Sequence, residues 1–154
     1  MSDISDIRTD ITAKLTAAVA AFSSAVAIDR WAGEEKAIKM DAVPAVLIQW
    51  TGRITEESME IGASTYMRSP VFVLYVVADD VSGGAYGDDI CSDILELADA
   101  ALNEASITIG GVADVGISRP YPGQFSDKLT ESLIGVHAGR YLYGQAWYVE
   151  RLVS

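Results

Sequence analysis

The stretch PVFVLYVVADD, residues 70–80, is an apolar run closed by two carboxylates. A strand with one face in water alternates apolar and polar side chains, and residues 71–78 show no such alternation. The run therefore predicts a strand that is covered on both faces. Helices on one side of a sheet leave the other side open. Either a folded-over hairpin or another subunit covers the other side. The alternative is that the strand lies in a fully internal two-layer core.

Two amphipathic helices are expected around this strand, in residues 3–22 and in about 88–104. In both segments apolar residues recur every three or four positions, which is the spacing of a helix with one apolar face. The first stripe comprises Ile4, Ile7, Ile11, Leu15, Val19 and Phe22. The second comprises Ile90, Ile94, Leu97, Ala98, Ala101 and Leu102.

The remaining segments read mainly as strands. Residues 25–33 and 37–50 look extended, and Pro44 marks the beginning of a strand because proline cannot donate a ladder hydrogen bond. Residues 51–69 predict a long hairpin or flap that leads into the apolar strand. Residues 119–132, with two prolines and few apolar side chains, predict an irregular and mobile excursion.

This order of elements predicts an α+β fold rather than alternating βα units. We expect a mostly antiparallel sheet with two amphipathic helices packed on one face, plus the long hairpin or flap. The 154 residues suit a single domain, 1–154. In the final strand, Tyr141, Tyr143 and Trp147 should share one face of the sheet.

Charge and composition narrow the classes of function. The chain carries 22 acidic and 11 basic residues, for a formal net charge of −11. Such a surface disfavours binding to a phosphate backbone or to an anionic membrane. The N-terminal sequence lacks the pattern of a signal peptide. Cys91 is the only cysteine, so no intramolecular disulfide can form, and a lone cysteine in a helix is expected to be a packing residue.

The sequence offers no set of residues suited to catalysis, and we expect no catalytic residue, cofactor or metal ligand. His137 is the only histidine, and no GxSxG motif accompanies it. GGAYGDD, residues 83–89, precedes a helix but lacks the lysine of a phosphate-binding loop. The four nearby aspartates lack the spacing of a calcium loop. Three tryptophans and seven tyrosines could line a ligand pocket, but they more often anchor cores and interfaces.

The pattern PAVLIQWTGRI, FVLYVVADD and GGAYGDDICSDILELADAAL resembles the tail terminator, or tail completion, proteins of tailed bacteriophages. The likeness is to the Mu-like branch, found also in prophages and phage-derived injection machines. It covers residues 4–22, 44–52, 53–69, 71–78 and 88–102.

The resemblance implies a structural virion protein. Small α+β subunits would form a ring, typically of six, that caps the tail tube, ends its polymerisation and presents a joining surface to the head. Implied partners are other copies of the chain, the tail tube protein, the tail sheath, and connector or neck proteins. DNA would pass through without being bound. The implied location is the head-proximal end of the tail, with assembly in the host cytoplasm.

Two alternatives remain open. A head–tail connector or neck completion protein would share the small ring-forming subunit. A small ligand-binding or enzymatic domain would instead use an aromatic pocket.

Two sets of residues are candidates for the ring. The flap carries cationic and large apolar side chains that would register against an acidic neighbour, and the final strand adds aromatic ones. The assembly candidates are Arg53, Tyr66, Met67, Arg68, Tyr141, Tyr143 and Trp147. An acidic channel wall would let DNA slide, and its candidates are Glu56, Glu57, Glu60, Asp79, Asp80, Asp88 and Asp89.

Overall fold

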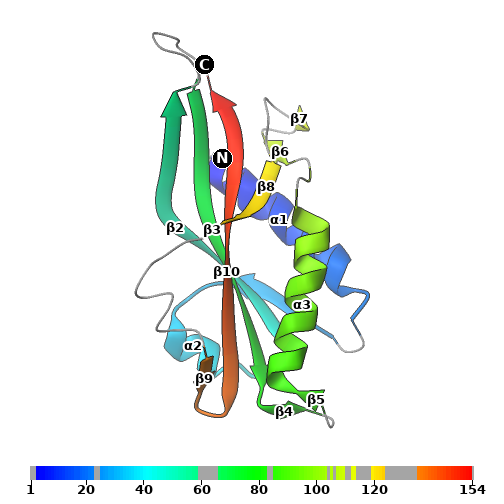
Figure 1. Cartoon of the computed structure of the whole chain (residues 1–154). Coiled ribbons are helices and arrows are strands. Elements are labelled where there is room, and N and C mark those ends of the chain that lie inside the picture. The colour runs from blue at the N-terminus through cyan, green and yellow to red at the C-terminus, as the bar shows by residue number, and fades with distance from the viewer. Residues whose placement is uncertain are drawn as a thin grey trace.

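The computed structural model describes residues 3–22, 25–58, 66–82, 85–103, 105, 107–109, 112–113, 119–123 and 135–153. Figure 1 traces the elements along the chain. In chain order they are α1 (Asp3–Val19), β1 (Ala27–Arg30), α2 (Glu34–Ile38), β2 (Ala45–Ser58), β3 (Tyr66–Asp79), β4 (Val81–Ser82), β5 (Ala85–Tyr86), α3 (Gly87–Leu102), β6 (Thr108–Ile109), β7 (Val112–Ala113), β8 (Arg119–Gly123), β9 (Gly135–His137) and β10 (Arg140–Val153).

The main sheet contains six strands, in the order β1-β2-β3-β10-β8, with β9 paired to the start of β10. Strands β1 and β2 are parallel, and every other pair in this sheet is antiparallel. The predicted α+β class with a mostly antiparallel sheet is therefore confirmed. The apolar run lies in β3, at the centre of the sheet, where each of its neighbours is a long strand.

One face of the sheet packs on the two long helices, which lie side by side against it (Figure 1). Alternate residues of β3, including Phe72, Leu74 and Val76, point to this face, as Val46 and Ile48 of β2 do. Helix α1 contributes Ile7, Ile11, Leu15 and Val19, and α3 contributes Ile90, Cys91, Ile94, Ala98 and Leu102. The predicted stripe of α1 is thus its buried face, whereas in α3 Ile90, Ile94, Ala98 and Leu102 of the predicted stripe are buried and Leu97 and Ala101 are only partly buried.

The opposite face is covered by the chain itself. Leu47, Val73, Tyr75, Val77, Leu142 and Ala146 form a second buried cluster with Ala37 of α2, and Trp31, Met40 and Val43 pack against it. The ring of Trp31 stacks on that of Tyr75 with centroids 4.3 Å apart. The segment that contains α2 therefore provides the second cover over this part of β3. Neither a hairpin nor a second subunit is needed there.

Several predicted boundaries were wrong. The first helix ends at Val19 rather than Phe22. Residues 34–38 form a helix, so the segment before Pro44 is not extended; β2 does begin directly after this proline. Helix α3 occupies Gly87–Leu102, close to the expected bounds.

The excursion predicted for 119–132 was also partly wrong, because Arg119–Gly123 pairs with β10 as the edge strand β8. An edge strand tolerates the two prolines, since one of its sides needs no hydrogen bond. Residues 124–132 lie outside the described residues.

The predicted flap is the continuation of two long strands. The register of β2 against β3 shifts between Trp50 and Ile54, and pairing then resumes as far as Ser58 and Tyr66. Strand β10 follows β3 along this length and ends opposite Tyr66. The far ends of β2, β3 and β10 project beyond both long helices (Figure 1). We call this three-stranded extension (residues 54–58, 66–70 and 149–153) the arm; the tip of the flap, residues 59–65, lies outside the described residues.

Candidate functional site

A groove of about 560 Å³ runs between α3 and β10. The helix supplies one wall and the strand supplies the other. The lining residues are Asp88, Ser92, Leu95, Glu96 and Asp99 from α3, and Tyr143, Gln145 and Trp147 from β10. The five helical residues are spaced by one, three or four positions, which places them along one flank of the helix.

The strand wall of the groove is aromatic. Tyr141 and Tyr143 stack at 5.8 Å between ring centroids, and both are half-buried against the core of the helix face. Trp147 lies deeper, with 2% of its surface exposed. Its indole N–H has no hydrogen-bond partner among the described residues. The three aromatic residues predicted for assembly thus share one face, with two at the surface and one in the core.

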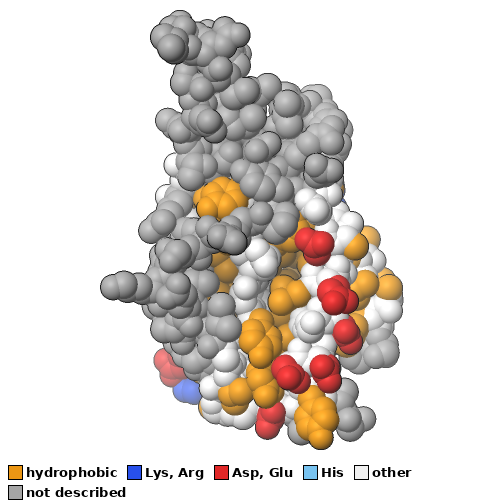
Figure 2. Space-filling view, in the orientation of Figure 1, with side chains coloured by type: hydrophobic (Ala, Val, Ile, Leu, Met, Phe, Trp, Pro, Cys, Tyr) orange, Lys and Arg blue, Asp and Glu red, His pale blue; other side chains and the backbone are white. Residues whose placement is uncertain are grey.

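The helix wall of the groove is acidic. The side chains of Asp88, Glu96 and Asp99 are exposed along it, and in Figure 2 carboxylates follow this helix beside a band of apolar side chains. Desolvation, followed by the Asp88 charge, raises the pKa of Tyr143. Desolvation, followed by the charges of Asp80 and Asp88, raises the pKa of Tyr141. Both phenols therefore stay protonated and can donate hydrogen bonds at neutral pH.

The first residue of α3, Gly87, packs closely against the end of β3, beside the groove. The Gly87 N–H donates to the Asp80 carbonyl at 2.7 Å. A side chain at this position would collide with the Asp79 carbonyl oxygen and would meet Tyr141 Cδ2 at 2.6 Å. The glycine of GGAYGDD thus permits close packing of a helix on a strand.

The four aspartates predicted for a channel wall occupy different settings. Asp79 pairs with Arg140, and Asp80 is exposed in the turn after β3. Asp88 and Asp89 lie in the first turn of α3, where the helix dipole favours negative charge. Only Asp88 of the four lines the groove. The described residues contain no group of three or more His, Cys, Asp or Glu side chains able to hold a metal ion.

The flap candidates can be placed by register alone. In the arm, Arg68 lies opposite Glu56 of β2 on one side and opposite Arg151 of β10 on the other. Met67 is similarly flanked by Glu57 and Leu152. Tyr66 pairs with Ser58 at the described end of the hairpin, and Arg53 lies in the register shift of β2. Glu60 lies outside the described residues. The structure also does not describe the side chains of the other flap candidates, which are Arg53, Glu56, Glu57, Tyr66, Met67 and Arg68.

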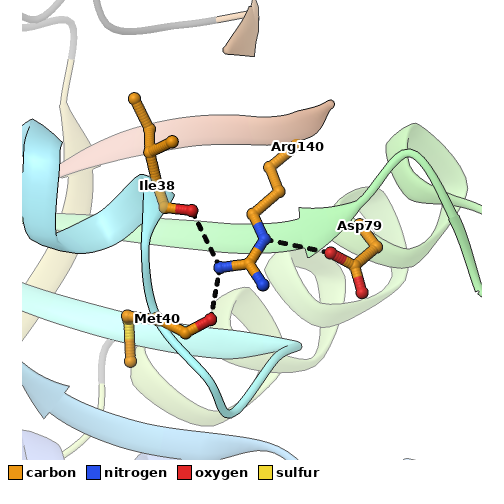
Figure 3. A network of polar contacts seen from close by, with 4 residues as sticks. All are labelled: Ile38, Met40, Asp79 and Arg140. Carbon is orange, nitrogen blue, oxygen red and sulfur yellow. Dashed lines mark hydrogen bonds and ion pairs between the residues drawn. The ribbon is translucent and has the colours of Figure 1, made fainter. Parts of the chain in front are cut away.

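Arg140 links the α2 segment, which covers the second face of the sheet, to β3. Arg140 Nε donates to Asp79 Oδ1 at 3.0 Å, and Nη1 donates to the carbonyl oxygens of Ile38, at 2.9 Å, and of Met40 (Figure 3). Residues from β3, β10 and the α2 segment therefore meet at one guanidinium. Sequence reasoning missed this residue, because its three partners lie 61 to 102 positions away along the chain.

Cys91 is a packing residue, as predicted. It is fully buried in the core of the helix face, and its thiol lies 3.7 Å from the carbonyl oxygen of Val76. Desolvation, with a smaller contribution from Asp88, raises the pKa of this thiol to about 12. A thiol in this state is a poor nucleophile at neutral pH.

The groove residues Ser92, Leu95, Glu96, Asp99 and Gln145 were also missed. The spacing of the acidic positions on α3 was visible in the sequence, but the strand that faces them was not.

Within the described ranges, no helix has the length and apolar character to cross a membrane. The chain matches no protein-family model, and a search of curated proteins finds no significant match.

Proposed function

We propose that this chain is a structural subunit of a ring that caps the tail tube of a tailed bacteriophage or a phage-derived particle. The ring would stop tube polymerisation and offer a joining surface to the head. The protein would act at the head-proximal end of the tail, after assembly in the host cytoplasm. Its partners would be other copies of itself, the tail tube protein, and sheath or connector proteins.

The observation that carries this proposal is the arm. Strands β2 and β3 continue past the register shift at Trp50 and Ile54, and their ends project beyond the helices (Figure 1). A small subunit that extends three paired strands from its body has a ready means of reaching a neighbour. The arm also lies where the resemblance to tail terminators places its flap.

The order of elements supports the same function. An N-terminal helix, a strand that begins after Pro44, a flap, an apolar strand and a second helix follow one another as in that family's pattern. The acidic groove and the absence of a metal-binding cluster among the described residues are compatible with a structural role.

Deleting residues 55–66 tests the proposal. The deletion leaves Ile54 opposite Pro70, with residues 67–69 free to form a short turn. We expect a folded monomer that neither forms rings nor shortens tubes assembled from the tail tube protein of the same virus. Light scattering would measure mass, and electron microscopy would measure tube length. Rings of the deletion variant, or full-length protein that neither oligomerises nor limits tube length, would contradict the proposal.

A second candidate is a small ligand-binding domain, which the aromatic and acidic lining of the groove favours. Carboxylates beside tyrosine and tryptophan rings suit an organic cation. Thermal shift with tetramethylammonium and with arginine tests this role. A rise in melting temperature that Glu96→Gln abolishes would support it, and no shift at millimolar concentrations of either probe would refute it.

A further inference from the structure

The acidic wall of the α3–β10 groove has no cationic partner among the described side chains. Asp88, Glu96 and Asp99 are exposed, and none of them forms an ion pair with a described residue. The strand wall opposite them is aromatic, with Tyr143 and Trp147 among its lining residues. In Figure 2 this face is red and orange, with carboxylates beside apolar side chains. Its chemistry suits a partner surface that carries guanidinium groups and apolar stems.

A surface of that kind exists elsewhere on the same chain. Arg8 of α1 is half-buried, and its Nε has no hydrogen-bond partner in the described part of the chain. Arg30, at the end of β1, is exposed. Helix α1 packs on β1, which brings these two residues onto adjoining elements, and burial followed by the charge of Arg30 lowers the pKa of the Arg8 guanidinium. Neither forms an ion pair with a described residue.

Three other basic residues of the described part of the chain form ion pairs within it, whereas Lys36 of α2 does not. Lys14 pairs with Asp10 at 2.9 Å, Lys39 with Glu35 at 2.7 Å, and Arg140 with Asp79 at 3.0 Å. Arg8 and Arg30, on adjoining elements, are thus two guanidinium groups without an ion pair to a described residue in a chain whose formal net charge is −11, and Asp29 lies beside them, where its carboxylate accepts from the Arg30 backbone N–H. We call these two residues the arginine edge.

The groove and the arginine edge lie toward opposite edges of the sheet. Strand β1 is one edge of the order β1-β2-β3-β10-β8, and β10 lies next to the other edge. Helix α1 packs over β1 and β2, whereas α3 packs over β3 and β10. A contact between the two surfaces thus joins different faces of two identical chains. Such a heterologous contact propagates from copy to copy and closes into a ring when the rotation permits.

We propose that the α3–β10 groove of one copy receives the arginine edge of the next copy. Arg30 would meet the carboxylates of α3, and the apolar stem of an arginine would lie against the tyrosine rings. This inference rests on the proposed ring function and names the surfaces through which the copies join.

Charge reversal on each side tests the pairing. The full chain would be compared with Arg30→Glu, Glu96→Arg and the double variant, by sedimentation velocity at low and high salt. We expect each single variant to weaken self-association by at least about tenfold, because like charges then face one another. The double variant, in which the charges are exchanged, should recover most of the association. Wild-type association should weaken as salt rises.

Two matched control variants change the net charge by the same amount as Arg30→Glu and Glu96→Arg, but at positions outside the proposed contact. Lys36→Glu reverses an exposed charge on α2, and Asp93→Arg reverses an exposed charge of α3 that does not line the groove. Both should associate within about twofold of the wild type, since charges outside a contact alter it little. Circular dichroism of every variant would establish that the fold is retained.

The possible failures are distinguishable. If the wild type forms rings and the two single variants form them equally well, the groove pairing is wrong and the ring function stands. If the single variants weaken but the double variant does not recover, this pairing is likewise overturned. If the wild type stays monomeric and leaves tube length unchanged, the ring function fails, and the pairing fails with it.

Discussion

Arg140 Nε donates to Asp79 Oδ1 at 3.0 Å, and these two residues are also paired across β10 and β3. The same guanidinium donates to the carbonyl oxygens of Ile38 and Met40, which close the cover of the second face. The side chain of Arg140 is 19% exposed and that of Asp79 is 44% exposed, so the guanidinium is the more shielded partner of this ion pair. One side chain thus links the central strand, the last strand and the α2 segment.

Replacing this arginine should loosen the cover. Arg140→Ala leaves two carbonyl groups and a carboxylate without their donor, so we expect a loss of about 2 kcal/mol in the free energy of unfolding. Urea denaturation would measure the loss, and hydrogen exchange should become faster in residues 31–43. As a control, Lys39→Ala removes the exposed ion pair with Glu35 and should cost about 0.5 kcal/mol or less. Equal stability of the two variants would contradict this account.

Gly87→Ala should reverse the usual effect of removing a glycine from a helix. Alanine normally stabilises a helical position by about 0.5–1 kcal/mol relative to glycine. Here the new methyl group would collide with the backbone oxygen of Asp79 and with the ring of Tyr141, so we expect destabilisation by about 1–3 kcal/mol. Thermal unfolding would measure it, with Ser92→Ala on the same helix as the control. A stabilised Gly87→Ala protein would disprove the close contact.

Cys91 should be inert in the native protein. Its pKa is raised from 9.0 to about 12, so the thiolate is scarce at pH 8, and its burial blocks access. A disulfide reagent at pH 8 should react at least about 100-fold more slowly with native than with urea-unfolded protein. Fast native reaction would show that the thiol is accessible.

The same thiol makes stability depend on pH in the alkaline range. The folded state holds its proton more tightly than the unfolded state does, so its contribution is complete below pH 9. That contribution decreases as the pH rises from 9 towards about 12. Cys91→Ala should reduce this alkaline loss, as measured by denaturation at pH 8 and pH 10.5. An identical loss in the variant would assign it to other groups.

The assembled protein should not bind duplex DNA. Each copy has a formal net charge of −11, and a ring multiplies this field, although screening limits its reach to about 10 Å at 0.1 M salt. A gel-shift experiment at low salt should show no retarded duplex, because no release of counterions would favour the complex. Retarded DNA would refute an acidic channel.

The sequence by itself determined the α+β class, the two long helices and the burial of the central strand. These features follow from local periodicity: apolar residues recur every three to four positions in α1 and α3, and the run from Val71 to Ala78 leaves no wet face. It also determined that β2 starts after Pro44, since proline cannot donate within a ladder.

Only the tertiary structure decided what covers the second face and where the groove lies. The five-residue helix α2 is too short for a periodic signal. Its place over Tyr75 depends on the stacking of Trp31 and on the bonds of Arg140. The groove joins α3 to a strand about 50 positions later in the chain, and the arginine edge joins α1 to β1. Contacts between segments so far apart leave no local pattern in a single sequence, because they arise only when the sheet brings those segments together.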